Sequence, residues 1–416
     1  MKNSIIRLLK KSERYAKTDM VYLVGQSSWL LIGQSIVFIS SFLLAWIFGN
    51  FVDPSDYGLY KFVLSIATLA TITTLTGLST ALARAYAQGH DVSLIKLLKL
   101  RIYWGILGTL ILFIVAGYYL TKDNTLLASL FAITALWIPF YETLSDYQQL
   151  LQGKKDFRTQ TIARTLQRII LTLSVVLTIL FSKNIILITL VFFAASTLSQ
   201  YLALRYTLKK YSLKDDSNVP YKSIITYGKR LSIQNIFFIG ASQLDKILMF
   251  KFLGPTQLAT YFFAVAIPQE LSGLLANVNS VAFPKLVDKE SPEFKKALLK
   301  KIALFNAILL VPIGLYIYAA PYLFVWFFPV YIDAVFVSQL FVGTILFIPT
   351  SLIWHYFYAV DNKPALWCGT FVGPSVLIIG ILVFVPQFGL IGAVIANYLR
   401  GFVDLFSGLY FFLKRR

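Results

Sequence analysis

The chain has 416 residues, of which 57% are hydrophobic and 14% are charged. A soluble protein carries nearly twice that fraction of charged residues, so the composition excludes a soluble multidomain protein and indicates one polytopic membrane bundle. The net charge of +19 would suit a nucleic-acid-binding protein. However, almost all Lys and Arg lie in or beside short gaps between apolar runs, and we therefore expect no nucleic-acid partner.

The first predicted element is a basic amphipathic segment over residues 1–23, where Ile and Leu lie among Lys and Arg. It lacks the pattern of a cleavable signal, and we expect it to lie on the cytoplasmic face of the membrane.

Twelve apolar segments follow, each of roughly the 20 residues that a helix needs to cross the hydrocarbon core. They cover residues 24–49, 59–80, 102–120, 126–146, 163–182, 184–206, 224–252, 257–281, 302–320, 334–359, 364–385 and 388–413.

The basic residues give these spans a direction. Because successive loops lie on alternate sides of the membrane, the Lys and Arg of each loop can be assigned to a side. Of the 38 Lys and Arg, 32 lie on one side, three lie on the other side, and three lie inside spans. Because Lys and Arg concentrate on the cytoplasmic side, this bias predicts a cell (inner) membrane protein with both termini in the cytoplasm.

The loops between the spans are short. The longest outer connection, residues 321–333, and the largest inner loops, near 207–222 and 283–301, are too small for a catalytic domain, and no GxxxxGK[ST] sequence occurs. The single cysteine, Cys368, can form neither an internal disulfide nor a metal cage. We therefore predict that the protein is not an enzyme and uses no cofactor and no metal.

An internal repeat divides the spans into two halves. Residues 51–66, FVDPSDYGLYKFVLSI, are similar to residues 252–267, FLGPTQLATYFFAVAI, and each stretch is an outer turn that leads into the second span of its half. The sequence thus predicts an all-α polytopic membrane protein, with about 12 transmembrane helices in two six-helix lobes around a central cleft. The predicted parts are the N-terminus 1–23, the N-lobe 24–206, a cytoplasmic linker 207–223, the C-lobe 224–413 and a basic cytoplasmic tail 414–416.

Five motifs in fixed order resemble those of one family. They are FVDPSDYGLYKF (51–62), GLSTALARAYAQG (77–89), QLLQGKKDFRTQTIAR (149–164), SQLDKILMFKFLGPTQLATY (242–261) and FGLIGAVIANYLRG (388–401). The chain resembles the polysaccharide-repeat flippases of the multidrug/oligosaccharidyl-lipid/polysaccharide (MOP) exporter superfamily. Asp53 and Ala259 replace a usual Gly in the two repeat turns, so these turns are expected to differ slightly in shape.

The resemblance implies a transporter that moves a lipid-linked (polyprenyl-diphosphate) oligosaccharide from the inner to the outer leaflet by alternating access, for cell-surface polysaccharide such as lipopolysaccharide. Its implied partners are that lipid-linked oligosaccharide, membrane lipids, and a glycan polymerase or glycosyltransferases.

Charges inside spans are costly to bury and are therefore candidates for substrate binding. Arg400 lies about 18 Å into the last span at 1.5 Å per residue, where its guanidinium could bind a phosphate or pair with Asp404, four residues on. Lys246 in the seventh span faces either the cleft or the lipid headgroups. Its neighbour Asp245 points about 100° away, so we expect no pair between these two residues.

Arg84 and Arg164 are expected at the inner membrane boundary, together with Arg101. Such residues set the topology, and Arg84 and Arg164 are further candidates for contact with the diphosphate. Glu142 and Asp146 lie near the inner end of the fourth span, where we expect them to reach water.

Four residues are candidates for coupling to a proton or sodium ion. Asp245, Asp404 and Glu270 supply carboxylates within spans, and His355 titrates near neutral pH. Glu270 follows Pro268, where we expect a kink. A carboxyl held neutral or paired at Glu270, and a packing role for His355, are the alternatives.

Three other functions remain open from the sequence. A multidrug-type exporter of the same superfamily would need an acidic or apolar pocket, and a lipid-linked cell-wall precursor flippase usually carries basic residues in its first spans, which residues 24–49 lack. A membrane-embedded glycan polymerase or ligase would need a larger outer loop than this chain has.

Overall fold

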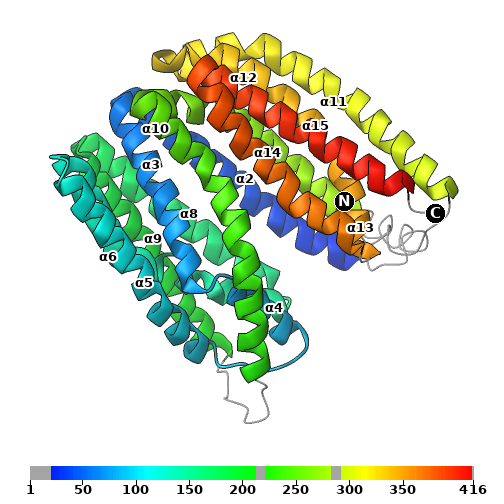
Figure 1. The fold of residues 1–416 in the computed structure, drawn as a ribbon. Helices are drawn as coiled ribbons and strands as arrows, with labels where there is room; N and C mark the ends of the chain where they lie inside the picture. Colours follow the sequence, from blue (N-terminus) through cyan, green and yellow to red (C-terminus); the bar gives the residue numbers. More distant parts are fainter. Residues whose placement is uncertain (1–19, 212–220, 283–291, 361, 415–416) are drawn as a thin grey trace, which may run out of the picture. The chain divides into compact units, whose positions relative to one another are not determined.

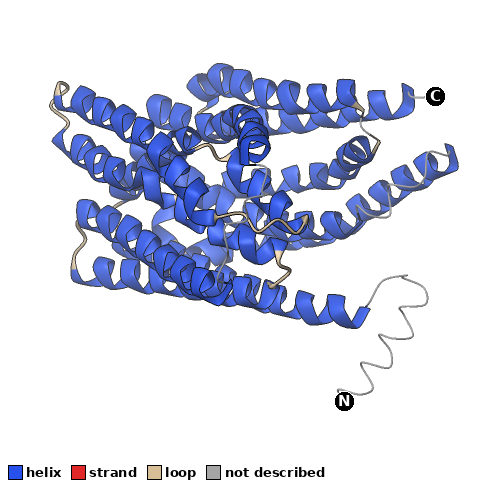
Figure 2. Ribbon diagram, turned by 90° about the horizontal axis from the view of Figure 1, so that it is seen from below, coloured by secondary structure: helices blue, strands red, loops and turns tan. Residues whose placement is uncertain are grey.

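The computed structural model describes residues 20–211, 221–282, 292–360 and 362–414, and every regular element in these ranges is a helix (Figure 2). This confirms the predicted all-α class. Most of the predicted basic N-terminus, and residues 415–416 of the tail, lie outside the described residues.

Most of the predicted spans correspond to single helices. Among the described residues, nine helices are long and apolar enough to cross a membrane, and one bent pair makes a tenth. The two remaining predicted spans are the arms of α10 (Tyr221–Ala282), which meet at Gly254 with φ 81° and ψ 179°. Only glycine adopts this conformation at low cost.

The chain forms two compact units. Unit 1 contains residues 1–45 and 70–235, and unit 2 contains residues 46–69 and 236–416. Both α2 (Met20–Phe51) and α10 therefore contribute to each unit. The two six-helix lobes with the boundaries given above stay a prediction.

Unit 1 is built mainly from long helices with short connections. Its elements, apart from the parts of α2 and α10, are η1 (Thr71–Thr74), α4 (Gly77–Ala87), α5 (Leu94–Leu120), α6 (Thr125–Tyr141), η2 (Thr143–Asp146), α7 (Tyr147–Gly153), α8 (Phe157–Phe181) and α9 (Ile185–Tyr211). Helix α5 packs along α6, and α8 packs along α9.

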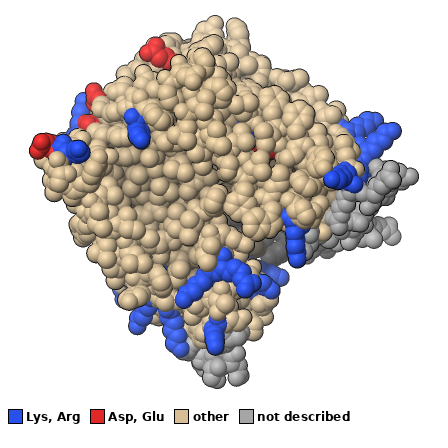
Figure 3. All heavy atoms as spheres, viewed as in Figure 1, with Lys and Arg blue, Asp and Glu red and all other residues tan. Residues whose placement is uncertain are grey.

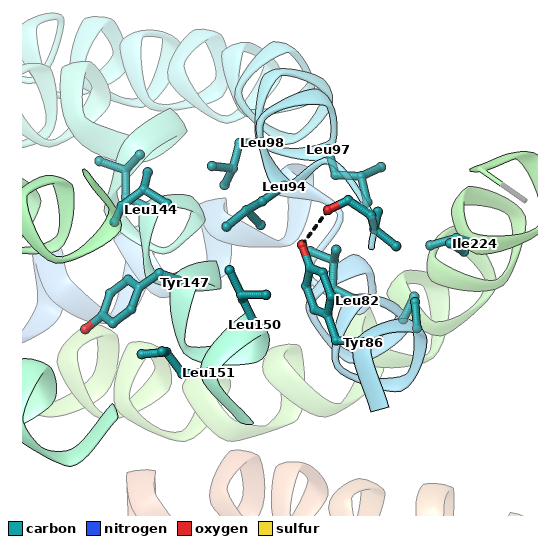
Figure 4. Packing of buried hydrophobic residues seen from close by; sticks show 14 residues of the cluster. Leu82, Tyr86, Leu94, Leu97, Leu98, Leu144, Tyr147, Leu150, Leu151 and Ile224 are labelled. Carbon is teal, nitrogen blue, oxygen red and sulfur yellow. Dashed lines mark hydrogen bonds between the residues drawn. The ribbon is translucent and has the colours of Figure 1, made fainter. Parts of the chain in front are cut away.

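A hydrophobic cluster joins α4, α5 and α7 to the first arm of α10 (Figure 4). Leu82, Leu97, Leu150 and Ile224 are among its buried members, and the Tyr86 hydroxyl donates a hydrogen bond to the Val92 carbonyl at 2.9 Å. Burying this much apolar surface fixes the ends of the four helices relative to one another.

Two of the predicted spans are interrupted. The span over 59–80 bends by 56° at η1, where Leu75 has φ 53°. The span over 126–146 changes to the 3-10 helix η2 at Thr143 and then continues into α7.

Unit 2 contains the remaining helices. They are α3 (Pro54–Ala70), α11 (Pro292–Phe327), η4 (Pro329–Tyr331), α12 (Ala334–Val342), η5 (Gly343–Thr350), α13 (Ser351–Ala359), α14 (Lys363–Phe388) and α15 (Leu390–Lys414). Helices α14 and α15 lie side by side (orange and red in Figure 1). The predicted span over 334–359 therefore consists of α12, η5 and α13 in succession.

The two repeat turns meet inside unit 2. A side chain on Gly58, from the first turn, would collide with the backbone of Pro255 in the second turn. The Phe62 and Phe250 rings stack with centroids 3.8 Å apart, and the ring centroids of Phe263 and Tyr57 are 5.1 Å apart. The similarity between the turns thus belongs to segments that pack against each other.

Most of the surface drawn in Figure 3 carries no charge, as expected for a surface in contact with lipid. Basic side chains gather in its lower part, near the ends of α4 and of the first arm of α10. The charge pattern of the sequence assigns these ends to the inner side.

Asp156 links α8 to α9 outside the spans. Its carboxylate accepts hydrogen bonds from Lys210 at 2.6 Å, from the Tyr211 hydroxyl at 2.7 Å and from the Thr159 amide at 3.2 Å. Partial burial would raise the pKa of Asp156, but these hydrogen bonds outweigh it and hold the pKa well below its usual range.

We expect Asp156→Asn to lower the free energy of unfolding by about 0.5–1 kcal/mol at neutral pH, since the pair with Lys210 is partly exposed. A depressed pKa stabilises the fold above the unfolded value of about 3.9 and ceases to do so in more acidic solution. The difference between the unfolding midpoint temperatures of wild type and variant should therefore become smaller as the pH falls below about 4. A difference in midpoint temperature that does not change with pH would contradict the depressed pKa of Asp156.

Candidate functional site

Four charged residues form a cluster in unit 2, two from α10 and two from α15. Lys246 donates a hydrogen bond to the Ser242 carbonyl and lies 3.3 Å from the carboxylate of Asp245. The expectation that these neighbours do not pair is wrong. The two side chains leave the helix in different directions, but the lysine side chain is long and flexible enough for its ammonium to reach the Asp245 carboxylate.

The predicted pair on α15 is present. The Nε atom of Arg400 lies 3.6 Å from a carboxylate oxygen of Asp404, which also lies against Gly373 of α14. The Arg400 side chain is 42% exposed, whereas Asp245 and Lys246 are 14% and 18% exposed. A long, single-contact pair of this kind leaves most guanidinium donors available to another acceptor.

The two pairs form one electrostatic group. Arg400 interacts with Asp245 as well as with Asp404. Beside them, Asn397 of α15 donates a hydrogen bond to the Ala393 carbonyl at 2.9 Å. With two carboxylates and two cations the group is neutral overall. An anion can therefore contact the unused donors of Arg400, where it competes with the two carboxylates for the cations, and a small cation can bind if an ammonium or guanidinium moves away.

The other two residues predicted to bind substrate belong to unit 1. Arg84 is exposed on α4, with its guanidinium 5.0 Å from the centre of the Tyr227 ring. Arg164 is exposed on α8. Both lie near the helix ends that the sequence assigns to the inner side.

The remaining ion-coupling candidates lie elsewhere in unit 2. Glu270 is half-buried on the second arm of α10 and makes no hydrogen bond or ion pair with the described residues. The backbone at Pro268 keeps helical φ and ψ, and the expected kink there stays a prediction. His355 is half-buried on α13.

The sequence missed one buried ion pair in unit 1. Arg101 and Asp146 form a salt bridge at 2.5 Å, and their side chains are 2% and 1% exposed. Arg101 also donates to Ser79 and to the backbone carbonyl of Thr74. The expectations that Arg101 only marks the membrane boundary and that Asp146 reaches water are therefore wrong.

The surroundings of Arg101 explain the difference. Its donors satisfy groups released where η1 interrupts the second span, and Asp146 ends the η2 break. A buried guanidinium with this many fixed acceptors is a structural group and is inaccessible to a substrate. The only signal in the sequence was two opposite charges in apolar segments, which does not reveal that they meet.

In the part of the chain that the structure describes, no group of three or more His, Cys, Asp or Glu side chains could hold a metal ion.

A helical bundle with many apolar spans and ionisable groups inside them defines the class of polytopic membrane transporters. The model of the family described as polysaccharide biosynthesis protein matches residues 23–290. The chain therefore belongs to this polysaccharide biosynthesis family, which confirms the resemblance drawn from its motifs.

Two solved structures have the same fold. A lipid II flippase MurJ in an inward closed conformation has a TM-score of 0.70, with 14% identity over 93% of this chain and 87% of that chain. An inward-facing multidrug resistance transporter of the MATE family in the MOP superfamily has a TM-score of 0.66, with 15% identity over 91% of this chain and 94% of that chain.

One curated relative is similar in sequence over most of its length. It is an uncharacterized membrane protein of Methanocaldococcus jannaschii, 22% identical over 93% of this chain and 83% of the relative. The family and these folds confirm the predicted class: this is a multi-pass membrane protein of the polysaccharide biosynthesis family, and its fold is that of the MurJ and MATE structures.

Proposed function

We propose that this protein flips a polyprenyl-diphosphate-linked oligosaccharide from the inner to the outer leaflet by alternating access, for the assembly of cell-surface polysaccharide. Its family supports a role in polysaccharide biosynthesis. In this proposal the protein lies in the cell membrane with both termini in the cytoplasm, and glycosyltransferases and a glycan polymerase act before and after it.

The observation that carries the proposal is the accessible guanidinium of Arg400. It lies within a span, is 42% exposed and makes one ion-pair contact at 3.6 Å. Arg101, the contrasting case, is 2% exposed and donates hydrogen bonds to Asp146, to Ser79 and to the Thr74 carbonyl. Paired donors on a guanidinium match the oxygen atoms of a diphosphate, and an ionised donor makes such hydrogen bonds strong.

Ion coupling follows from the neutrality of the cluster. A diphosphate that binds Arg400 and Lys246 competes with Asp404 and Asp245 for the same cations. A carboxylate that loses its cation in a poorly solvated site favours a proton or a sodium ion. Substrate binding and ion binding at Asp245 and Asp404 are therefore linked in this proposal, with Glu270 and His355 as further coupling candidates.

Arg84 and Arg164 have a separate part in the proposal. Both are exposed at the end of unit 1 assigned to the inner side. They would meet the diphosphate as it leaves the inner leaflet, before it reaches Arg400.

The test is a flipping assay in proteoliposomes with a fluorescent polyprenyl-diphosphate oligosaccharide. We expect Arg400→Ala to slow flipping by about 10- to 100-fold, because it removes charge-assisted hydrogen bonds worth about 1.5–3 kcal/mol. Arg400→Lys should keep part of the rate, since it keeps the charge but loses the paired donors. Lys122→Ala, which removes an exposed charge outside the spans, serves as the control. Flipping by Arg400→Ala at the wild-type rate would refute the assignment.

A second candidate is a flippase for a lipid-linked cell-wall precursor, which is favoured by the fold of the lipid II flippase MurJ. The same vesicles loaded with that precursor separate the two functions. An exporter of organic cations, suggested by the MATE fold, would instead move a cationic dye and ignore both lipids.

A further inference from the structure

A pocket of about 380 Å³ opens at one end of unit 2. It lies where the second arm of α10, α12 and α15 begin and where α14 ends. Its volume is at the lower end of the range for small-molecule sites, about 300–1,000 Å³, so it suits one compact ring better than an extended chain. The sequence assigns all of these helix ends to the outer side.

One wall of the pocket contains a buried aromatic residue. Tyr331 is 2% exposed, and its ring stacks on Phe263 with centroids 4.0 Å apart. Its hydroxyl is fully buried and makes no hydrogen bond with any described residue. Tyr331 therefore shapes the wall, and the groups that can hydrogen-bond a ligand lie at the rim.

The rim supplies further hydrogen-bonding groups. The carboxylate of Asp333 and the amide of Gln257 are exposed, and their side chains make no hydrogen bond with the described residues. Thr260 adds a hydroxyl to the buried wall. A carboxylate accepts two hydrogen bonds and an amide both donates and accepts, which matches neighbouring hydroxyls on one ring.

Aromatic rings complete the lining. Phe336 and Phe388 are exposed at the rim, 56% and 52%. Their electron-rich faces suit the C–H face of a saturated ring. The described lining contains no Lys or Arg and one acid, Asp333, so the pocket disfavours a phosphate or diphosphate.

We propose that this pocket binds a single sugar ring, which is neutral or carries an amine, through its hydroxyls. It would be distinct from Arg400 and Lys246, which suit the diphosphate. Resting on the proposed function, the ring is a unit of the glycan that has reached the outer side, and the pocket would hold it while the lipid carrier leaves.

The proposal can be tested without transport. Saturation-transfer NMR on the full-length protein in phosphatidylcholine nanodiscs, with a panel of methyl hexosides and methyl N-acetylhexosaminides, should show binding of at least one sugar. Gln257→Ala/Asp333→Asn should weaken that binding by at least about tenfold, since it removes the amide of Gln257 and replaces the charged acceptor of Asp333 by a neutral amide. The matched control Gln152→Ala/Asp123→Asn changes exposed residues of unit 1 and should bind as wild type does.

Tyr331→Phe gives a second control, on the wall of the pocket. Because the hydroxyl is buried without a partner, its removal should leave thermal unfolding unchanged or raise its midpoint. The same variant should bind the sugar as wild type does. Weaker sugar binding by a stable Tyr331→Phe variant would contradict the assignment of binding to the rim groups Gln257 and Asp333.

Other outcomes separate this inference from the proposed function. Sugar binding that persists in Arg400→Ala, while flipping fails, would support two distinct sites. Sugar binding by a protein that flips none of the lipids would leave the pocket assigned and refute the flippase. No signal from any sugar, or a signal from glycerophosphoethanolamine alone, would overturn the pocket proposal in favour of an empty surface or a lipid headgroup site.

Discussion

Replacing Arg101 by Leu should lower the free energy of unfolding by about 3–5 kcal/mol, because it leaves Asp146 buried without its cation. The same change removes the donor to the Thr74 carbonyl, which η1 leaves outside the regular helix pattern. Asp146→Leu should have a similar effect, since it leaves the guanidinium unpaired. Thermal unfolding of the purified protein in detergent measures both.

The double variant Arg101→Leu/Asp146→Leu separates burial of a lone charge from loss of packing. It should be more stable than either single variant, with a coupling energy of about 2–3 kcal/mol. Lys154 and Asp91 offer the control pair, because their side chains are 29% and 46% exposed. Breaking that pair should change stability by no more than about 1 kcal/mol. Equal effects at both pairs would show that burial of the Arg101 pair does not matter.

Gly58→Ala should destabilise unit 2 by about 1–3 kcal/mol. The added methyl group would occupy the position of the Pro255 carbonyl, and backbone cannot move aside as a flexible side chain does. The stacked rings of Phe62 and Phe250 lie on the same pair of segments and would have to shift as well. Thermal unfolding again gives the measurement.

Gly117→Ala is the matched control for that substitution. Gly117 lies in α5 with nothing within 4 Å of its added methyl group. Alanine is the better helix former, so this change should be neutral or stabilise by up to about 1 kcal/mol. A loss of stability equal to that of Gly58→Ala would mean that the contact with Pro255 is not the cause.

The periodicity and length of the apolar runs predicted the helices well but not their interruptions. The span over 59–80 reads as continuous, yet it bends at Leu75. Such a bend depends on hydrogen bonds to the backbone groups that it releases. The Ser232 hydroxyl accepts a hydrogen bond from the Gly77 amide, and Arg101 donates one to the Thr74 carbonyl. Both partners are distant in sequence, so local propensity carries no information about them.

The candidate site was predicted in part. Arg400 and Asp404 pair because positions four apart on a helix face each other, which sequence spacing alone shows. The interaction of Arg400 with Asp245 needs two helices to meet, and the pocket around Tyr331 needs four segments. Neither has a sequence signature, because the groups involved are separated by tens or hundreds of residues.

The sequence by itself determined that this chain is a helical, multi-pass membrane protein with a biased distribution of basic residues. It could do so because the hydrocarbon core requires long apolar helices and the membrane sorts charge, and both constraints act on local composition. Only the tertiary structure decided which intramembrane charges are accessible. The sequence places Arg101 at a membrane boundary and Arg400 within a span, but it does not show how exposed either guanidinium is. One is sealed by acceptors from three other segments and the other retains an exposed guanidinium, since burial depends on what packs around a residue and not on the residue itself.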